Sequence, residues 1–286
     1  AGGNGVLAQA AAAADDGTEY IDMADLTLGK KLGNGAFGDV LRAMLTLHAP
    51  GGRSIDLDAA VKMIKAEYAN DLRARADIIA ENERLKQCDS PFVNKSFGAA
   101  NDPPTGCLYI VLELCDLGDL KGHTDDRHRE ALAGSRMTPV PHAEMILIAL
   151  QMLLGVAYVH GKKMVHRDLA ARNIMLKTGP GGAIVALLAD LGMAREVGAG
   201  GYYSLKYTLD GDTIKIPVAW SPPESFEMQE SKDGGDKKYK ATQMLDLWAL
   251  AVTLYEMLTN CSGGRNGGPY LADGTVHQIK TMKVKG

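Results

Sequence analysis

The residues most able to do chemistry lie in one short stretch, His166-Arg167-Asp168-Leu169-Ala170-Ala171-Arg172-Asn173. Asp168 and Asn173 stand five residues apart, so a single rigid loop could present both side chains at once. An aspartate can accept or orient the proton of a hydroxyl group, and an amide oxygen is a ligand that magnesium accepts. The stretch therefore predicts a loop that offers a base and a metal ligand to one reacting group.

A glycine-rich segment far upstream has the composition of a phosphate-binding loop. It reads G-N-G-A-F-G-D-V from Gly33 to Val40. Glycine lets the backbone approach a triphosphate closely and donate N–H groups to it. Dinucleotide-binding folds use a similar spacing between a strand and a helix. Here strand-like residues follow the glycines, which favours a hairpin; a plain glycine-rich turn is the alternative.

Together these stretches resemble the protein-kinase family. H-R-D-x-x-x-x-N and G-x-G-x-x-G-x-V are its catalytic-loop and glycine-loop patterns, and Asp190-Leu191-Gly192 stands where the family has D-F-G. Ala170 and Arg172 make the catalytic loop similar to the tyrosine-specific branch, because the serine/threonine branch usually has lysine at the first of these positions. The resemblance runs from about Leu26 to the last residue. It implies an α+β, bilobal fold, with a small five-stranded sheet plus one helix and a larger, mainly helical lobe.

The resemblance also implies transfer of the γ-phosphoryl group of ATP to a tyrosine hydroxyl. Asp168 would accept or orient the hydroxyl proton, with Arg172 among the catalytic residues, and Asn173 and Asp190 would bind Mg²⁺ or Mn²⁺. Lys62, in the A-x-K pattern of Ala60-Val61-Lys62, would hold the α- and β-phosphates. An exposed lysine at the end of a strand is the alternative for Lys62.

A carboxylate must orient Lys62, and two glutamates of the helix predicted after it could do so. Alignment with the family through Leu85 favours Glu81 over Glu83. One helical turn beyond Glu81 is the apolar Leu85, where the family has a column of apolar residues, whereas one turn beyond Glu83 is the polar Gln87.

The hinge segment that would contact adenine runs from Tyr109 to Leu120. By resemblance, Leu112 is the gatekeeper, the backbones of Glu113 and Cys115 pair with the adenine edge, and Asp119 reaches a ribose hydroxyl. For the apolar members of this site, ordinary core packing is nearly as good an interpretation. The nucleotide-binding residues implied by the resemblance are Leu32, Gly33, Gly35, Gly38, Val40, Ala60, Lys62, Leu112, Glu113, Cys115, Asp119 and Met175.

Several residues depart from the family pattern. Leu191 replaces the phenylalanine of D-F-G, which predicts altered switching with the chemistry retained, and Ser96 is polar where the regulatory column is usually apolar. Ala219 and Pro222 replace family residues around the substrate-docking segment. These departures support the main alternative, a pseudokinase that acts as a scaffold or allosteric partner. A dual-specificity or serine/threonine kinase is a third interpretation.

Tyrosines mark candidate regulatory sites. Tyr202-Tyr203 resemble the twin activation-loop tyrosines of insulin-receptor-like and Trk-like receptor kinases. A phosphate on Tyr203 could pair with Arg167 and order the loop, and Leu191 would belong to the same switch. Residues 20–23 fit Y-x-x-M, a weak phosphotyrosine docking motif. The alternative for Tyr202 and Tyr203 is that they are two ordinary loop tyrosines without a regulatory role.

The pattern of apolar residues predicts the elements that position these groups. Residues 1–25 are expected to form a disordered tail or juxtamembrane-like linker, 26–114 the small lobe, and 115–286 the hinge and a C-terminal lobe that lacks its usual end. The small lobe should have two strands over 26–47, strands over 58–64, 91–97 and 108–114, and a helix over 70–87. The larger lobe should have a connector over 121–141, a helix over 142–161, a hairpin over 174–188, a loop over 227–240 and a fully buried helix over 245–258. The helix over 142–161 should bury the face formed by Ile146, Ala149, Leu150, Leu153, Leu154 and Ala157.

Composition bounds the remaining possibilities. The 286 residues carry a net charge of −4 and 46% hydrophobic residues, which fits a globular protein without a nucleic-acid footprint. The four cysteines have no zinc-ligand spacing, and no membrane span or signal peptide is predicted. We expect a cytoplasmic domain, or the intracellular part of a membrane receptor. Its partners would be tyrosine-containing protein substrates, a second copy for trans-autophosphorylation, and SH2-type domains.

Overall fold

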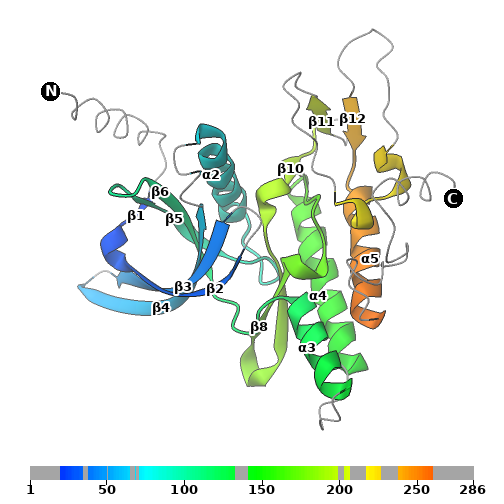
Figure 1. The fold of residues 1–286 in the computed structure, drawn as a ribbon, viewed down its shortest axis with the longest axis horizontal. Coiled ribbons are helices and arrows are strands. Elements are labelled where there is room, and N and C mark those ends of the chain that lie inside the picture. The colour runs from blue at the N-terminus through cyan, green and yellow to red at the C-terminus, as the bar shows by residue number, and fades with distance from the viewer. Residues whose placement is uncertain are drawn as a thin grey trace. The chain divides into compact units, whose positions relative to one another are not determined.

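The computed structural model describes residues 20–34, 38–49, 51–64, 68, 71–132, 141–198, 203–206, 217–226 and 238–259. The chain forms two compact units (Figure 1). The first ends at Leu114, and the second begins at Cys115 and also includes residues 90–93. The first is rich in strands and the second is mainly helical, which confirms the α+β class.

The first unit is built on a six-stranded sheet in the order β1-β5-β6-β4-β3-β2. Its strands are β1 (Tyr20–Ile21), β2 (Leu26–Asn34), β3 (Gly38–Ala49), β4 (Arg53–Ile64), β5 (Ser96–Asp102) and β6 (Cys107–Glu113). Helix α2 (Leu72–Lys86) packs against β4, β5 and β6 (Figure 1). It begins at Asp71, whose carboxylate accepts hydrogen bonds from the backbone N–H groups of Arg73 and Ala74 and so satisfies two of the helix's unpaired donors.

The sheet has one strand more than predicted. Residues 1–25 were expected to form a disordered tail or linker, but the chain forms a strand from Tyr20. β1 pairs in parallel with β5, and a short 3-10 turn, η1 (Met23–Asp25), follows it. Ile21 and Met23 pack against the hydrophobic core of the sheet. Burial of these two side chains explains why the prediction of a tail to residue 25 was wrong for this part. The predicted strand over 91–97 was also misplaced, because β5 begins only at Ser96.

In the described part of the second unit the helices are α3 (Leu120–Leu132), α4 (His142–Gly161) and α5 (Met244–Thr259), and α5 packs against both α3 and α4 (Figure 1). The hairpin of β8 (Ile174–Thr178) and β9 (Ile184–Leu188) packs against α4 and confirms the predicted hairpin. Two further antiparallel pairs join β7 (Met164–Val165) to β10 (Arg195–Glu196) and β11 (Tyr203–Lys206) to β12 (Lys238–Ala241). Short 3-10 turns are η3 (Ala171–Asn173), η4 (Pro180–Gly182), η5 (Leu191–Met193), η6 (Val218–Trp220) and η7 (Pro223–Phe226).

Two predicted irregular segments contain regular structure instead. Helix α3 occupies most of the predicted connector over 121–141. The Asp119 carboxylate accepts from Gly122 N at 2.9 Å where this helix begins, and Lys121 pairs with Asp125 one turn later at 2.6 Å. Such caps and i,i+4 pairs stabilise a helix that is polar on most sides and therefore lacks the apolar periodicity used for prediction. Likewise, β12 takes the end of the predicted loop over 227–240.

The burial of α4 and α5 also differs from expectation. α4 buries Ile148, Met152, Gly155, Val156 and Val159, whereas the predicted face is largely exposed, with Ile146 68% accessible. Helix α5 is buried on one face rather than all round, because Leu258 is 62% accessible. Both helices are apolar on nearly every side, so the sequence alone could not choose which face packs.

Among the described residues, α4 is long and apolar enough to cross a membrane by length and composition alone. In this fold α4 packs against β7, β9 and α5. Its buried residues are therefore the core of the second unit.

Gly155 fixes the buried face of α4. A Cβ at this position would lie 2.7 Å from the carbonyl oxygen of Phe92 and 3.4 Å from Leu188 Cβ. No side chain larger than hydrogen fits without movement of the Phe92 backbone. The helix therefore approaches residues 90–93 closely at this one point.

We expect Gly155→Ala to lower the free energy of unfolding by about 1–2 kcal/mol, because the clash with a backbone carbonyl outweighs the gain in helix propensity of about 1 kcal/mol. The matched control is Gly161→Ala at the end of the same helix, where a Cβ would meet no atom within 4 Å. That variant should be neutral or more stable by up to about 1 kcal/mol. Urea unfolding of both variants measures the difference, and equal effects would contradict this account of α4.

Candidate functional site

In the first unit, Lys62 and Glu81 form a buried ion pair. Lys62 Nζ lies 2.7 Å from Glu81 Oε1 and 2.8 Å from Oε2, and both residues are less than 10% accessible. Glu83, the other candidate, lies on the exposed side of α2, with its carboxylate 3.7 Å from Lys86. Of the two glutamates considered from the sequence, only Glu81 contacts Lys62. The pair joins β4 to α2 and holds the ammonium group in one orientation.

The glycine segment joins β2 to β3. Gly33 pairs with Val40 across the two strands, and Gly35 lies outside the described residues. A Cβ at Gly38 would lie within 1.6 Å of the carbonyl oxygen of Met63. Pairing of β3 with β4 thus requires glycine at Gly38 whether or not a phosphate binds, a constraint that spacing did not indicate.

Loss of the Glu81 carboxylate should be costly. Glu81→Ala would leave the buried Lys62 ammonium without this partner, and we expect the free energy of unfolding to fall by about 3 kcal/mol. Glu83→Ala, two residues along the same helix, removes an exposed ion pair with Lys86 and a long hydrogen bond of 3.4 Å from Asn82 Nδ2, and it should cost much less, about 1 kcal/mol or below. Guanidinium unfolding compares the two. Similar losses would show that the buried pair does not stabilise the first unit.

In the second unit, the buried carboxylate of Asp246 anchors the backbone of the catalytic-loop stretch. Asp246 is 0% accessible. Its Oδ2 accepts from His166 N at 2.7 Å and from His160 Nε2 at 2.8 Å, and its Oδ1 accepts from Arg167 N at 2.8 Å. Arg167 has a φ of 74°, a left-handed conformation that is strained for a residue with a side chain. These contacts hold the backbone of the loop in place and stabilise the strained turn.

His166 supports the same turn from its side chain. Its Nε2 lies 3.0 Å from the carbonyl oxygen of Ala189, and its Nδ1 accepts from Asp168 N at 3.3 Å. A ring that donates from Nε2 and accepts at Nδ1 is a neutral imidazole in one tautomer. His166 is therefore a structural link between the candidate catalytic loop and the segment that precedes Asp190.

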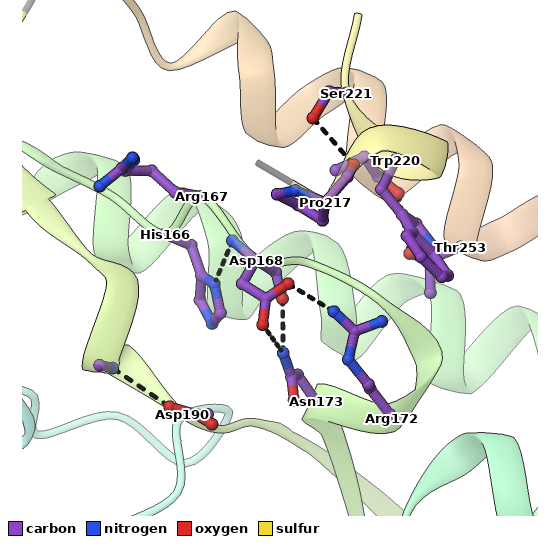
Figure 2. Close-up of polar contacts among 12 residues, drawn as sticks. His166, Arg167, Asp168, Arg172, Asn173, Asp190, Pro217, Trp220, Ser221 and Thr253 are labelled. Atoms are coloured by element: carbon purple, nitrogen blue, oxygen red, sulfur yellow. Dashed lines mark hydrogen bonds and ion pairs between the residues drawn. The ribbon is translucent and has the colours of Figure 1, made fainter. Parts of the chain in front are cut away.

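The Asp168 carboxylate is held by two neighbours in the same loop (Figure 2). Oδ1 accepts from Arg172 Nη2 at 2.5 Å, and Oδ2 accepts from Asn173 Nδ2 at 2.8 Å. Asn173 Nδ2 also donates to the Asp168 carbonyl oxygen at 2.6 Å. These contacts fix the direction of the Asp168 carboxylate, which is what a group that orients a substrate hydroxyl requires.

Trp220 and Glu256 extend this arrangement. Trp220 belongs to the segment expected from the sequence to dock substrate, whereas Glu256 was not assigned a site role. The Arg172 guanidinium lies over the Trp220 ring, 4.8 Å from its centroid, which is cation–π geometry. Trp220 Nε1 donates to the buried Glu256 carboxylate at 2.9 Å. A tryptophan after Pro217-Val218-Ala219 was visible in the sequence, but no spacing rule could have placed it under Arg172.

Asp190 has a left-handed backbone, with φ 61°, and its Oδ1 accepts from Gly192 N at 3.2 Å. Leu191 is 0% accessible, so the leucine is a fully buried apolar side chain. The Arg167 guanidinium donates to the carbonyl oxygen of Met193 at 3.2 Å. Arg167 therefore already contacts the segment that follows Asp190.

The hinge residues divide between the two units. In the first, Ala60 pairs with Leu112 across β4 and β6, and Glu113 N donates to the carbonyl oxygen of Lys95 at 2.9 Å. In the second, the Cys115 carbonyl accepts from Gly118 N at 3.2 Å. The expected pairing of the Glu113 and Cys115 backbones with adenine stays a prediction.

Asp119, expected to contact a ribose, caps α3 through its Oδ1 as described above and forms a β-bridge with Met175. The capping role was missed from the sequence because α3 itself was missed. Leu32 is exposed on β2 and Val40 is partly buried on β3.

Asp116 ties the hinge segment to the end of β8. Its carboxylate accepts from the Thr178 hydroxyl at 2.7 Å and from Thr178 N at 2.8 Å. These two hydrogen bonds, the hydroxyl first, lower the pKa of Asp116 below its ordinary value of 3.8. The contact favours the ionised carboxylate in the folded chain.

Stability should therefore depend on pH through Asp116. Because the folded-state pKa is lowered, the stabilisation is present above about pH 3.8 and is lost as pH falls through the folded value. Asp116→Ala should be less stable than the native chain at neutral pH, and the difference should shrink between about pH 5 and pH 3. Thr178→Val, which keeps the backbone donor, should show a smaller difference. The midpoints of urea unfolding of the native chain and both variants, measured across this pH range, test this prediction. If the stability difference between Asp116→Ala and the native chain does not change with pH, the ionisation of Asp116 is not linked to stability.

Some candidate residues lie outside the part of the chain that the structure describes. Tyr202 is one of them, and for Tyr203 only the backbone is described, paired with Ala241 in the β11–β12 ribbon. The Glu224 side chain is likewise not described. Ala219 lies in η6, directly before Trp220, and Pro222 follows this turn.

The oxygen ligands in the second unit suit a hard divalent cation. Asn173 commits its amide nitrogen to Asp168, so the group it could offer a cation is its oxygen; Asp190 supplies a carboxylate. In the described ranges no three His, Cys, Asp or Glu side chains gather around one point. The two oxygen donors fit Mg²⁺ or Mn²⁺, since magnesium is usually held by one or two protein oxygens together with substrate phosphates.

Comparison with known proteins identifies the family. Residues 26–275 match the family model for protein tyrosine and serine/threonine kinases. The chain is 31% identical to the BDNF/NT-3 growth factors receptor of Gallus gallus, over 86% of this chain and 27% of that receptor. It is 30% identical to the insulin-like receptor of Drosophila melanogaster, over 80% of this chain and 10% of that receptor. The chain belongs to the protein tyrosine and serine/threonine kinase family, and it spans about a quarter and a tenth of the length of these relatives.

Proposed function

We propose that this chain is a protein-tyrosine kinase domain that transfers the γ-phosphoryl group of ATP to tyrosine hydroxyls. The observation that carries the proposal is the fixed Asp168 carboxylate, held by Arg172 and Asn173 on a loop that Asp246 anchors. A reacting hydroxyl needs an oriented acceptor, and the fixed direction of the Asp168 carboxylate supports this role.

Each candidate residue has a defined task in this proposal. Asp168 orients the tyrosine hydroxyl and accepts its proton, and Lys62, fixed by Glu81, contacts the α- and β-phosphates. Asn173 and Asp190 hold Mg²⁺ or Mn²⁺, whose charge would stabilise the negative oxygens of the transferred group. The chain's own contribution is therefore mainly positioning, which is the chief requirement of phosphoryl transfer.

The stack of Arg172 on Trp220 supports tyrosine as the acceptor. The stack places a planar cation and an aromatic ring beside Asp168, where the ring of a substrate tyrosine could pack. The two curated relatives are both named as receptors. A tyrosine kinase in the cytoplasmic part of a receptor-like protein, acting on protein substrates and on a second copy, accounts for these features together.

The test is phosphate transfer from Mg·ATP to a poly-Glu/Tyr peptide. Asp168→Asn should reduce the rate about 10²- to 10⁴-fold, because the acceptor loses its charge. Asp126→Asn, the same change at an exposed position of α3, should keep the native rate. A matched serine peptide should accept little phosphate. Equal transfer to serine would point to a serine/threonine or dual-specificity kinase.

Activation-loop phosphorylation is part of the proposal. Arg167 lies next to Asp168 and reaches the segment after Asp190, so a phosphate on Tyr203 or Tyr202 could replace the Met193 carbonyl as its partner and order that segment. Phosphotyrosine mapping of the same reactions tests this; it should find these tyrosines modified before the rate rises. The phosphotyrosines would then be the sites for SH2-type partners.

A pseudokinase scaffold is the second candidate, favoured by Leu191, Ala219 and Pro222. It predicts nucleotide-dependent thermal stabilisation without transfer in any of the reactions above. Buried Leu191 argues for retained chemistry, since it keeps an apolar side chain where the family pattern has one.

A further inference from the structure

Two polar residues meet in the interior of the first unit where α2 packs on β5. Asn82 is 0% accessible, and Ser96 Oγ donates to Asn82 Oδ1 at 2.8 Å. Ser96 Oγ in turn accepts from Gly98 N at 3.1 Å. A buried amide left without a partner would cost about 1–3 kcal/mol, so each residue makes the other tolerable in the core. Ser96, which looked like a departure from an apolar column, therefore has a specific partner.

The local backbone of β5 is shaped around this contact. The pairing of β5 with β6 shifts register between Ser96 and Gly98, which marks a bulge. Gly98 has a φ of 146°, a conformation that side chains rarely adopt. The bulge leaves Gly98 N to donate to Ser96 Oγ, and this bond fixes the hydroxyl that reaches α2.

The contact bears directly on the candidate phosphate site, because Asn82 follows Glu81 in the helix. Adjacent helical residues point about 100° apart around the axis. Glu81 is held by Lys62 on β4 and Asn82 by Ser96 on β5. Arg75, near the start of α2, also donates from Nη1 to the Gly106 carbonyl oxygen at 2.6 Å. The contacts of Glu81 and Asn82 to two different strands constrain the rotation of the later part of α2 about its axis.

We propose that the Ser96–Asn82 hydrogen bond is a positioning contact that sets the rotation of α2 and so holds the Glu81 carboxylate on Lys62. Ser96 and Asn82 are positioning residues, since they act through Glu81 and touch no phosphate. The consequence for catalysis rests on the proposed kinase function; the link to the ion pair does not.

The decisive experiment is a double-mutant cycle on stability, which needs neither nucleotide nor activity. Glu81→Gln is introduced into the native chain and into Ser96→Ala, and unfolding is followed in denaturant. If Ser96 positions Glu81, the ion pair is already weakened in Ser96→Ala. Glu81→Gln should then change the unfolding equilibrium constant less, with a coupling of about threefold or more. Additive effects would overturn the proposal, because they would show that Ser96 only fills space.

Two further variants control this cycle. Ile78→Val removes one methylene from a buried side chain of the same helix and should be additive with Glu81→Gln. Ser96→Thr keeps the hydroxyl and should restore the full effect of Glu81→Gln. If Ser96→Thr does not restore the effect of Glu81→Gln, the hydrogen bond is not what links Ser96 to Glu81. The same conclusion follows if Ser96→Ala couples to Glu81→Gln no more strongly than Ile78→Val does.

Kinetics then separate this inference from the kinase proposal. With a transferring native chain, Ser96→Ala should raise the KM for ATP about threefold or more, and the KM for the peptide should stay unchanged. An unchanged KM for ATP would overturn the catalytic consequence. If the native chain transfers no phosphate, the kinase proposal fails, and the stability cycle still decides whether Ser96 and Asn82 position Glu81.

Discussion

The second unit depends on one buried carboxylate. Asp246 sits at the start of α5, far along the chain from the loop it holds, and accepts hydrogen bonds from two consecutive backbone N–H groups and a histidine ring. A charge with no exposure is unfavourable unless its lone pairs are used, and here three donors use them. The same bonds stabilise the left-handed Arg167. The direction of Asp168, the next residue, follows from that turn.

The first unit depends on a different interaction, a buried ion pair between a strand and a helix. Its candidate phosphate-binding lysine lies on a strand, but the carboxylate that orients it lies on a helix, and a helix can roll on a sheet. Buried polar contacts have preferred directions. The ion pair of Lys62 with Glu81 and the neighbouring contact of Asn82 with Ser96 join adjacent residues of α2 to two different strands.

The departures from the family pattern are of two kinds. Leu191 stands where the family pattern has phenylalanine, so one apolar side chain replaces another. It is fully buried, and the site keeps its apolar character. Ser96 introduces a polar group into a packed region and is compensated by Asn82. Neither change removes a group that would handle phosphate, proton or metal.

By itself, the sequence determined the family, the α+β class and the identity of the groups that could do chemistry, because these depend on residue type and short spacing. Asp168, Asn173, Asp190 and Lys62 could all be named in this way, and the helix over 142–161 had its bounds predicted correctly. The preference for Glu81 over Glu83 also came from the sequence, and the contact with Lys62 agrees with it. Only the tertiary structure placed Trp220 against Arg172 and joined Ser96 to Asn82, since these contacts link residues distant in the chain. It also decided which side of α4 is buried. That helix is apolar all round, so its packing was set by Gly155, where the absence of a side chain lets the Phe92 backbone approach.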